Sequence, residues 1–262
     1  MSVEPRVSGL QHPDSRSFEQ VADLYERARP GYPEEIVAWL VERLDLRRGR
    51  TVLDLGAGTG KLTRALVATG AEVIALEPGD EMRAQLQRAV PEARVLAAGA
   101  EAIPLPDDSL DAATAGQSFH WFRLDEAVPE VDRVLRPGAG LGLVWNMRDQ
   151  DDELQREITE LLAPFVPPGR EGEGPGVTEF FRREAFAESP LFERFEEREA
   201  RFAEELDAEM LVGRISSISF VAAAAGEERA RLQEALRELA ATRGGRVDFR
   251  YLTEALVTFS VA

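Results

Sequence analysis

The feature that most constrains the fold of this chain is a turn with three glycines at alternate positions, Gly56, Gly58 and Gly60. An apolar run at residues 52–55 precedes the turn, and apolar residues at helical spacing follow it, so the segment predicts a buried strand, a tight turn and a helix. Glycine adopts backbone angles that other residues avoid and has no side chain, which lets the main chain approach a ligand closely. At the start of a helix, this arrangement is typical of a nucleotide-binding site.

The spacing of the glycines distinguishes between the known classes of nucleotide-binding motif. The dinucleotide fingerprint places its third glycine, or an alanine, five residues after the first, where this chain has Lys61. A phosphate-binding P-loop needs glycine at position 55 and serine or threonine at position 62, and both are leucine. The spacing therefore argues against a nicotinamide-dependent oxidoreductase, which stays open as an alternative, and Lys61 is not a P-loop lysine.

An acidic residue at the end of the next expected strand strengthens this interpretation. Residues 72–76 predict a strand that ends at Glu77, about 20 residues after the first glycine, where nucleotide-binding sheets place a carboxylate on the ribose hydroxyls. A helix is then expected to begin with Asp80 as its N-cap. Ribose binding is the favoured role for Glu77, and a solvated loop acid is the alternative.

The segment from Asp54 to Gly60, Asp-x-Gly-x-Gly-x-Gly, resembles the first motif of class I S-adenosylmethionine-dependent methyltransferases. The resemblance implies S-adenosyl-L-methionine as cofactor and S-adenosyl-L-homocysteine as product. It also implies that Asp54 fixes the turn and a water near the amino group of the cofactor, and that Met82 lies against the adenine. The other cofactor-binding residues implied in these two loops are Gly56, Ala57, Gly58, Gly60, Glu77 and Pro78.

Residues 97–106 match the stretch that borders the adenine in the same family. Many members carry an aspartate two places before the position of Glu101, where it accepts a hydrogen bond from the adenine amino group. This chain departs from that pattern, because the position is Gly99. The backbone of Ala100 and the carboxylate of Glu101 are the two candidates for replacing the contact.

Several more segments resemble a subgroup of small-molecule methyltransferases similar to trans-aconitate methyltransferases. These segments are residues 18–32, 117–122, 133–138 and 145–146. The resemblance implies an N-terminal lid in which Tyr25 and Tyr32 cover the methionine end of the cofactor and Arg29 can meet a carboxylate. Gln117 is expected at the cofactor, and Tyr32, Trp121 and Trp145 are expected to face the substrate. Ordinary packing is the alternative for the aromatic residues.

His120 is the one plausible imidazole base, because the second histidine of the chain, His12, lies in a polar N-terminal segment. The alternative is a histidine of the pocket wall that hydrogen-bonds the backbone. A base is needed only where the nucleophile carries a proton. If the methyl acceptor is a carboxylate, an arginine such as Arg29 would orient it instead.

Expected strands alternate with expected helices through the first part of the chain. The strands are predicted near residues 52–55, 72–76, 94–97, 110–115 and 141–145. This alternation predicts an α/β fold with a doubly wound, mostly parallel sheet. The resemblance implies the seven-stranded Rossmann-like methyltransferase fold, with a terminal antiparallel strand pair and a helical cap. We expect a single domain over residues 1–262, with a lid at 1–35, a cofactor-binding core at 36–149, and cap helices and final strands at 150–262.

Composition limits the partners that we expect. The formal net charge is -17, and no basic stripe is visible, so a nucleic-acid substrate is disfavoured. The chain has no cysteine and two histidines, which argues against a metal site. It shows no apolar run of membrane-spanning length and no apolar signal core, so we expect a cytoplasmic protein that does not bind a membrane.

These observations predict an S-adenosylmethionine-dependent methyltransferase that acts on a small molecule at oxygen, nitrogen or carbon. The suggestion of a carboxylate acceptor comes from the subgroup resemblance alone. The alternative is a methyltransferase-like protein that binds the cofactor without turnover and serves as a partner or regulator. The acceptor and the oligomeric state are not predicted.

Overall fold

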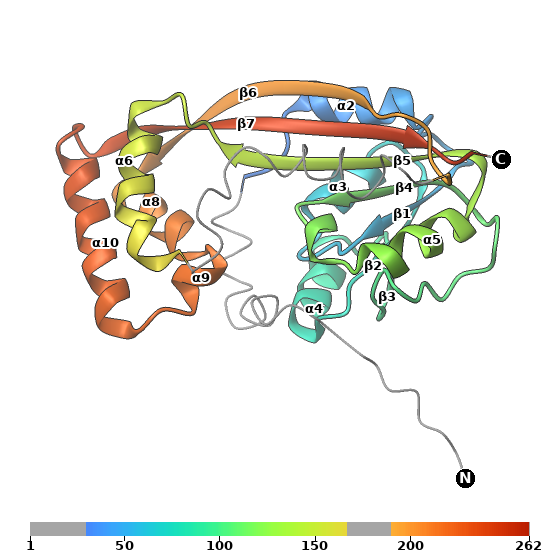
Figure 1. Ribbon diagram of the computed structural model, residues 1–262, viewed down its shortest axis with the longest axis horizontal. Coiled ribbons are helices and arrows are strands. Elements are labelled where there is room, and N and C mark those ends of the chain that lie inside the picture. The colour runs from blue at the N-terminus through green and yellow to red at the C-terminus, as the bar shows by residue number, and fades with distance from the viewer. Residues whose placement is uncertain (1–29, 167–189, 262) are drawn as a thin grey trace, which may run out of the picture.

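The computed structural model describes residues 30–166 and 190–261 (Figure 1). Its strands are β1 Thr51–Leu55, β2 Glu72–Leu76, β3 Arg94–Leu96, β4 Leu110–Gly116, β5 Leu135–Arg148, β6 Glu196–Asp207 and β7 Arg246–Phe259. Its helices are α2 Glu34–Arg43, α3 Lys61–Val67, α4 Asp80–Ala89, α5 Leu124–Val134, α6 Glu153–Leu162, α8 Ala208–Ser216, α9 Ser219–Ala222 and α10 Gly226–Ala241, with 3-10 turns η2 Phe119–Trp121 and η3 Ala163–Phe165. No helix in these two ranges is long and apolar enough to cross a membrane.

The strands form one seven-stranded sheet in the order β3-β2-β1-β4-β5-β7-β6. Strands β1 to β5 are parallel, whereas β7 pairs antiparallel with both β5 and β6. The chain winds outward from β1 through β2 to β3 and then crosses back to β4. The strand order therefore reverses between β1 and β4, which is the position where open α/β sheets bind ligands. The predicted fold class, including the terminal antiparallel pair, is confirmed.

Two local predictions from the sequence are wrong. Asp80 is the first helical residue of α4 and Gly79 is the N-cap, because the side chain of Asp80 forms no cap bond and pairs with Arg83 instead. Strand β5 is longer than residues 141–145, because its first residue, Leu135, already pairs with Leu110. The register then shifts, so that residues 136–139 bulge out of the strand before pairing resumes between Ala112 and Gly140.

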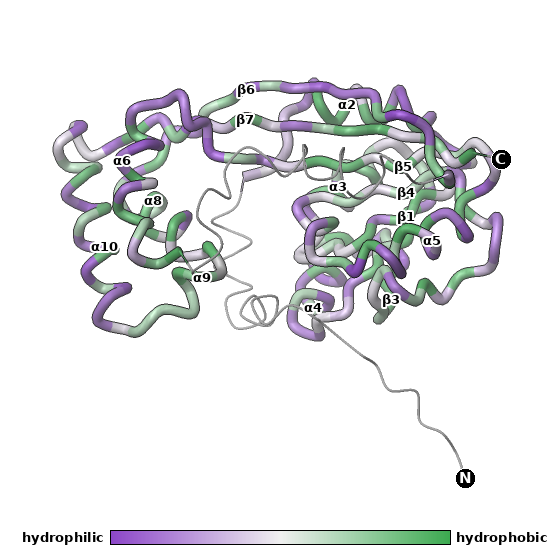
Figure 2. Tube along the Cα trace, viewed as in Figure 1, coloured by the Kyte–Doolittle hydropathy of each residue, from purple (hydrophilic) through white to green (hydrophobic). Residues whose placement is uncertain are grey.

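Two hydrophobic cores cover the two faces of the sheet. Alternation along β1 places Val52 in the core that α2 and α3 cover, and Leu53 and Leu55 in the core that α5 covers. Because helices cover both faces, the parallel strands are apolar almost throughout, as Figure 2 shows for β1 and β4. This packing holds the carboxyl ends of the strands, and the loops that follow them, in fixed positions.

A third core lies at the far end of the long β6–β7 ribbon. Helices α6, α8, α9 and α10 pack there around Leu211, Leu236 and Phe249. Figure 1 shows these helices beyond the carboxyl ends of the parallel strands, on the side where the loops of β1 and β4 open. The sequence placed cap helices at this end of the sheet. In the structure their core is built on the ribbon rather than on the parallel strands.

Gly60 allows α3 and α4 to pack closely. Its φ angle is 93°, and a Cβ at this position would lie 2.6 Å from Cδ1 of Leu86 and 3.0 Å from Cγ2 of Val90. Leu86 is fully buried. The third glycine of the motif therefore serves the contact between two helices.

We expect Gly60→Ala to lower the free energy of unfolding by about 2–4 kcal/mol, since it adds overpacking to the strain of a left-handed backbone. Gly49→Ala is the matched control, because Gly49 has a φ of 85° and a Cβ at that position would meet nothing within 4 Å. The control should lose only about 1 kcal/mol. Urea denaturation of both variants measures the difference, and equal losses would contradict the packing role of Gly60.

Candidate functional site

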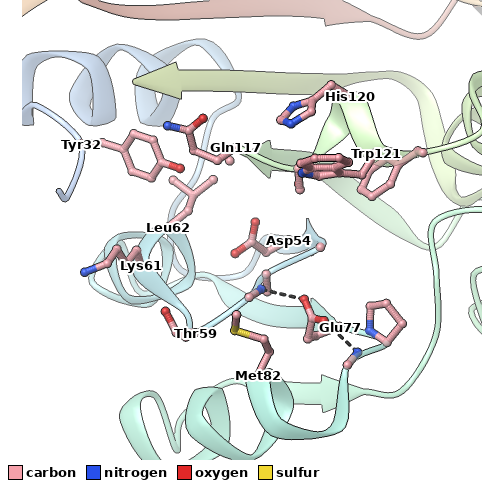
Figure 3. Close-up of a pocket in the computed structure, with 18 of the residues that line it drawn as sticks. Tyr32, Asp54, Thr59, Lys61, Leu62, Glu77, Met82, Gln117, His120 and Trp121 are labelled. Carbon is pink, nitrogen blue, oxygen red and sulfur yellow. Dashed lines mark hydrogen bonds between the residues drawn. The ribbon is translucent and has the colours of Figure 1, made fainter. Parts of the chain in front are cut away.

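A cavity opens at the reversal point of the sheet, between the loops that follow β1, β2 and β4 (Figure 3). The segment before α2 and the turn η2 complete its wall. The residues that line it are Pro30, Tyr32, Asp54, Gly56, Ala57, Gly58, Thr59, Lys61, Leu62, Glu77, Pro78, Gly79, Met82, Gly116, Gln117, Ser118, His120, Trp121 and Phe122. The cavity thus collects residues from four separate segments of the chain.

Most of the residues singled out from the sequence meet in this cavity. Those that line it are Tyr32, Asp54, Gly56, Ala57, Gly58, Glu77, Pro78, Met82, Gln117, His120 and Trp121. Gly60, Ala100, Glu101 and Trp145 are not part of the lining. Tyr25 and Arg29 lie outside the described residues.

The carboxylate of Glu77 joins two loops at the floor of the cavity. Its Oε2 accepts a hydrogen bond of 2.8 Å from the backbone N–H of Gly58, and its Oε1 accepts one of 2.8 Å from the N–H of Gly79 (Figure 3). The first donor belongs to the turn after β1 and the second to the loop after β2. Only 7% of Glu77 is exposed. A solvated loop acid is therefore not the role of this residue, because its charge is buried and paired with backbone donors.

The first two glycines of the motif do different things. Gly58 has a φ of 57°, and a Cβ there would meet nothing within 4 Å, so its backbone borders open space in the cavity. Gly56 has a φ of 60°, and a Cβ there would lie 2.8 Å from Cβ of Ser118. Gly56 thus lets the turn after β1 pack against the loop after β4. Gly58 leaves room for a ligand against the main chain.

Asp54 is buried beneath the glycine turn. The hydroxyl of Thr63 donates to Oδ2 at 2.6 Å, and the hydroxyl of Thr114 donates to Oδ1 at 3.3 Å. Burial raises the pKa of Asp54 to about 7, the nearby charge of Glu77 acts in the same direction, and the hydroxyl hydrogen bonds oppose both. A cation in the cavity would therefore favour the ionised form of this carboxyl.

Gln117 takes an unusual backbone conformation at the end of β4. Its φ angle is 58°, a left-handed value that residues other than glycine seldom adopt. Its side-chain Nε2 donates to the backbone carbonyl of Asn146 at 2.8 Å, which ties the loop after β4 to β5. Strained residues of this kind gather at functional sites, and this one turns the following segment, with His120 and Trp121, toward the cavity.

The imidazole of His120 is oriented by Trp145. The indole Nε1–H donates to Nδ1 of His120 at 3.2 Å, and Trp145 itself is almost fully buried. A neutral imidazole whose Nδ1 accepts a hydrogen bond carries its own hydrogen on Nε2. His120 therefore presents a hydrogen-bond donor at Nε2 rather than the lone pair that a general base needs. The role of Trp145 is to hold this imidazole from behind the cavity wall.

Glu101 occupies the space beside Gly99. A Cβ on Gly99 would lie 2.7 Å from Oε2 of Glu101, while Oε1 accepts a hydrogen bond of 3.0 Å from the backbone N–H of Arg123 at the start of α5. Ala100 is buried in the core beneath. Of the two candidates for the missing aspartate contact, the carboxylate of Glu101 thus lies next to the position that an aspartate side chain would take.

Sequence reasoning missed several residues of the lining. Thr59, Lys61 and Leu62 follow the glycines and were considered only as parts of the turn and the helix. Ser118 is buried, and its hydroxyl donates to the backbone carbonyl of Leu55 at 2.7 Å. These residues could have been predicted from their positions in the sequence, because each lies within a motif that already contained a proposed site residue.

Comparisons with known proteins agree with this geometry. A family model described as a methyltransferase domain matches residues 53–142. An uncharacterized methyltransferase of Mycobacterium tuberculosis is 37% identical over 228 residues, which cover 87% of this chain and 87% of the relative. A malonyl-[acyl-carrier protein] O-methyltransferase of Enterobacter lignolyticus is 33% identical over 52% of this chain and 57% of its own length.

The fold is also similar to a solved structure. A putative type II methyltransferase from Anaeromyxobacter dehalogenans superposes with a TM-score of 0.63 at 27% identity. The match covers 88% of this chain and 97% of that one. The likeness therefore extends over the sheet and the cap helices together.

The raised pKa of Asp54 predicts an inverted dependence of stability on pH. A carboxyl with a pKa near 7 when folded and an ordinary value of 3.8 when unfolded binds more protons in the folded state. The stabilisation by this carboxyl is therefore fully present below about pH 4. As the pH rises toward about 7, that stabilisation is lost and the free energy of unfolding falls by up to ~4 kcal/mol. Asp54→Asn should remove this loss, so that its stability relative to wild type grows between these two pH values.

The exposed Asp248 provides the control for this comparison, because Asp248→Asn makes the same chemical change away from the site. Urea denaturation at intervals across that pH range gives the two differences from wild type. A difference for Asp54→Asn that does not depend on pH would show that burial does not shift the pKa of Asp54.

Proposed function

Because this chain belongs to the class I S-adenosylmethionine-dependent methyltransferases, we propose that its cavity binds S-adenosyl-L-methionine and that a small-molecule acceptor is methylated there. The observation that carries the proposal is the pair of hydrogen bonds by which Glu77 joins the backbone of Gly58 to that of Gly79. This pair lies at the edge of open space, which a side chain on residue 58 would enter. The loops that the bridge joins are the ones that a nucleoside cofactor contacts in this type of fold.

The residues present fit the proposed cofactor. Each oxygen of Glu77 accepts a hydrogen bond from one backbone N–H, and a carboxylate oxygen can accept more than one hydrogen bond, so a ribose hydroxyl can donate to the same carboxylate. Met82 and Pro78 line the adjoining wall with apolar surface suited to the adenine. Asp54 stabilises a positive charge in the cavity in its ionised form. Bound S-adenosyl-L-methionine supplies a methyl group on a positively charged sulfur, which leaves as a neutral thioether.

The chain's own contribution to methyl transfer is alignment in an enclosed site. Trp121 and Phe122 provide aromatic surface in the cavity wall, and aromatic faces attract a sulfonium by cation–π interaction. The hydroxyl of Tyr32 lies over the end of β4, since a Cβ on Gly116 would collide with it. Figure 3 shows Tyr32 and Gln117 on the same side of the cavity, and both line it.

We further propose a carboxylate oxygen as the methylated atom. Such a nucleophile has no proton to lose, which agrees with an imidazole of His120 that presents its Nε2–H and not a base. The donor would hold and orient the carboxylate. The resemblance to trans-aconitate methyltransferases and the name of the Enterobacter relative, an O-methyltransferase, support the same direction.

The two other functions considered from the sequence lose support. The Mycobacterium tuberculosis relative is named a methyltransferase, and the match covers 87% of its length. This argues against a nicotinamide-dependent oxidoreductase. A role as a cofactor-binding partner without turnover has no observation that favours it over the enzyme. Our expectations of no nucleic-acid partner, no membrane binding and a cytoplasmic location stay proposals that rest on composition.

We expect isothermal titration calorimetry to show micromolar binding of both S-adenosyl-L-methionine and S-adenosyl-L-homocysteine, and none of nicotinamide cofactors. Glu77→Gln should weaken binding of both by about tenfold or more, because one backbone N–H would then face an amide NH2 instead of a carboxylate oxygen. Glu72→Gln is the matched control, since Glu72 is the exposed first residue of the same strand. Wild type that binds neither compound would refute the proposed function, and an unaltered Glu77→Gln would refute the ribose assignment.

His120→Gln separates a hydrogen-bond donor from a general base. The glutamine amide can donate from about the position of Nε2, so we expect kcat/KM to fall by no more than about tenfold, with an unchanged dependence on pH. Removal of a general base would lower the rate by about 100-fold or more and change the dependence of the rate on pH. The measurement is production of S-adenosyl-L-homocysteine with a panel of carboxylic acids, followed as a function of pH.

A further inference from the structure

Arg148 is the last residue of β5, the strand that leads from the cavity to the cap helices (Figure 1). Asn146, two residues earlier, accepts from the cavity residue Gln117 through its backbone carbonyl and donates through Nδ2 to the carbonyl of Gly31 at 2.8 Å. Side chains alternate along a strand, so Arg148 is on the same face as the side chain of Asn146, roughly 7 Å farther along. Arg148 thus lies farther along β5 than the residue that contacts Gln117, next to α6, where its Nη1 reaches the backbone of Gln155.

The guanidinium of Arg148 has one hydrogen bond and no acidic partner within residues 30–166 and 190–261. Its Nη1 donates to the backbone carbonyl of Gln155 on α6 at 3.2 Å. The carboxylates nearest to it in sequence are engaged elsewhere. Arg201 pairs with Asp149 at 3.2 Å and with Asp151 at 3.4 Å, and Asp152 lies 3.7 Å from Arg250. Arg148 is therefore a positive charge for which this end of the sheet supplies no counter-charge.

The surroundings of Arg148 disfavour the charged form of its guanidinium. Burial alone lowers the pKa of its guanidinium to about 10, and the group stays charged at neutral pH. Beside it, Gln155 is fully buried, and its side-chain oxygen has no hydrogen-bond partner among the described residues. Arg148 itself is half-buried, and a cation partly removed from water without an acidic partner is harder to accommodate than an apolar side chain. An anionic ligand would supply the missing charge.

We propose that Arg148 binds an anionic group of the methyl acceptor, a carboxylate or a phosphate, remote from the atom that is methylated. The inference rests on the proposed function, because it assumes that the acceptor enters the cavity between the cofactor loops and the cap. A planar guanidinium binds such groups through two parallel hydrogen bonds, which gives direction as well as charge. The acceptor is then held at two points, the reacting end near His120 and the anionic end at Arg148.

The first test uses the unliganded protein. Arg148→Met removes the charge and keeps a long side chain, so its thermal midpoint should lie above that of wild type. Arg201→Met is the matched control, because Arg201 is a neighbouring arginine that pairs with both Asp149 and Asp151. Its midpoint should stay equal or fall. A midpoint of Arg148→Met below that of wild type would mean that Arg148 stabilises the free protein, and it would overturn the proposal.

The second test uses defined anions on the same three proteins with saturating S-adenosyl-L-homocysteine. Glutarate is compared with pentanoate, and glycerol 3-phosphate with glycerol, at equal ionic strength. We expect at least one anionic group to raise the midpoint of wild type and Arg201→Met by about 2–4 °C beyond its matched compound, and to lose that excess in Arg148→Met. The responding pair distinguishes carboxylate from phosphate. No excess in wild type, or an excess that survives in Arg148→Met, would overturn the inference.

The two proposals fail in distinguishable ways. Stabilisation by S-adenosyl-L-homocysteine alone is measured first on all three proteins. If wild type is not stabilised, the proposed function fails. If all three are stabilised and the anions show no dependence on Arg148, cofactor binding holds and only the inference about Arg148 fails.

Discussion

The site depends on a single buried carboxylate. Glu77 accepts hydrogen bonds from Gly58 and Gly79, and so fixes the turn after β1 against the loop after β2. Without it, these two backbone donors would lose their acceptor, and the backbone bond from Ala57 to Leu76 would be left to join the two segments. Because a carboxylate oxygen can accept more than one hydrogen bond, the same group that builds the floor of the cavity is also our proposed contact to the ribose of the cofactor.

The sheet brings the remaining groups to this carboxylate. The reversal of strand order between β1 and β4 leaves a crevice that neighbouring crossover helices do not fill, and Asp54, Gln117 and His120 reach it from two adjacent strands. The long strand β5 then leads away to a second group of helices with its own core. The proposed function thus places cofactor binding in the parallel half of the molecule, and the proposed role of Arg148 places acceptor recognition where β5 meets the cap.

Sequence patterns predicted the parallel half well, because its signals are local. A strand, a glycine turn and an acid about 20 residues later specify positions in one βαβ unit. The same patterns were weaker where a contact joins distant segments. Nothing near Gly60 reveals that it packs against Leu86, and nothing near Asp80 reveals that its side chain turns to Arg83 rather than capping α4. His120 was identified as an imidazole near the site, but its orientation by Trp145 is a contact across 25 residues.

The sequence by itself determined the fold class, the family and the loops that line the cavity, since hydrophobic periodicity and glycine spacing are properties of neighbouring residues. Only the tertiary structure decided the states of the polar groups. Burial raises the pKa of Asp54, and Trp145 selects the nitrogen that carries the hydrogen of His120. The pairing of Asp149 and Asp152 with other arginines leaves Arg148 without a counter-charge in the part of the chain that the structure describes. Each of these depends on solvent exclusion and on contacts between segments far apart in the chain, which no local pattern encodes.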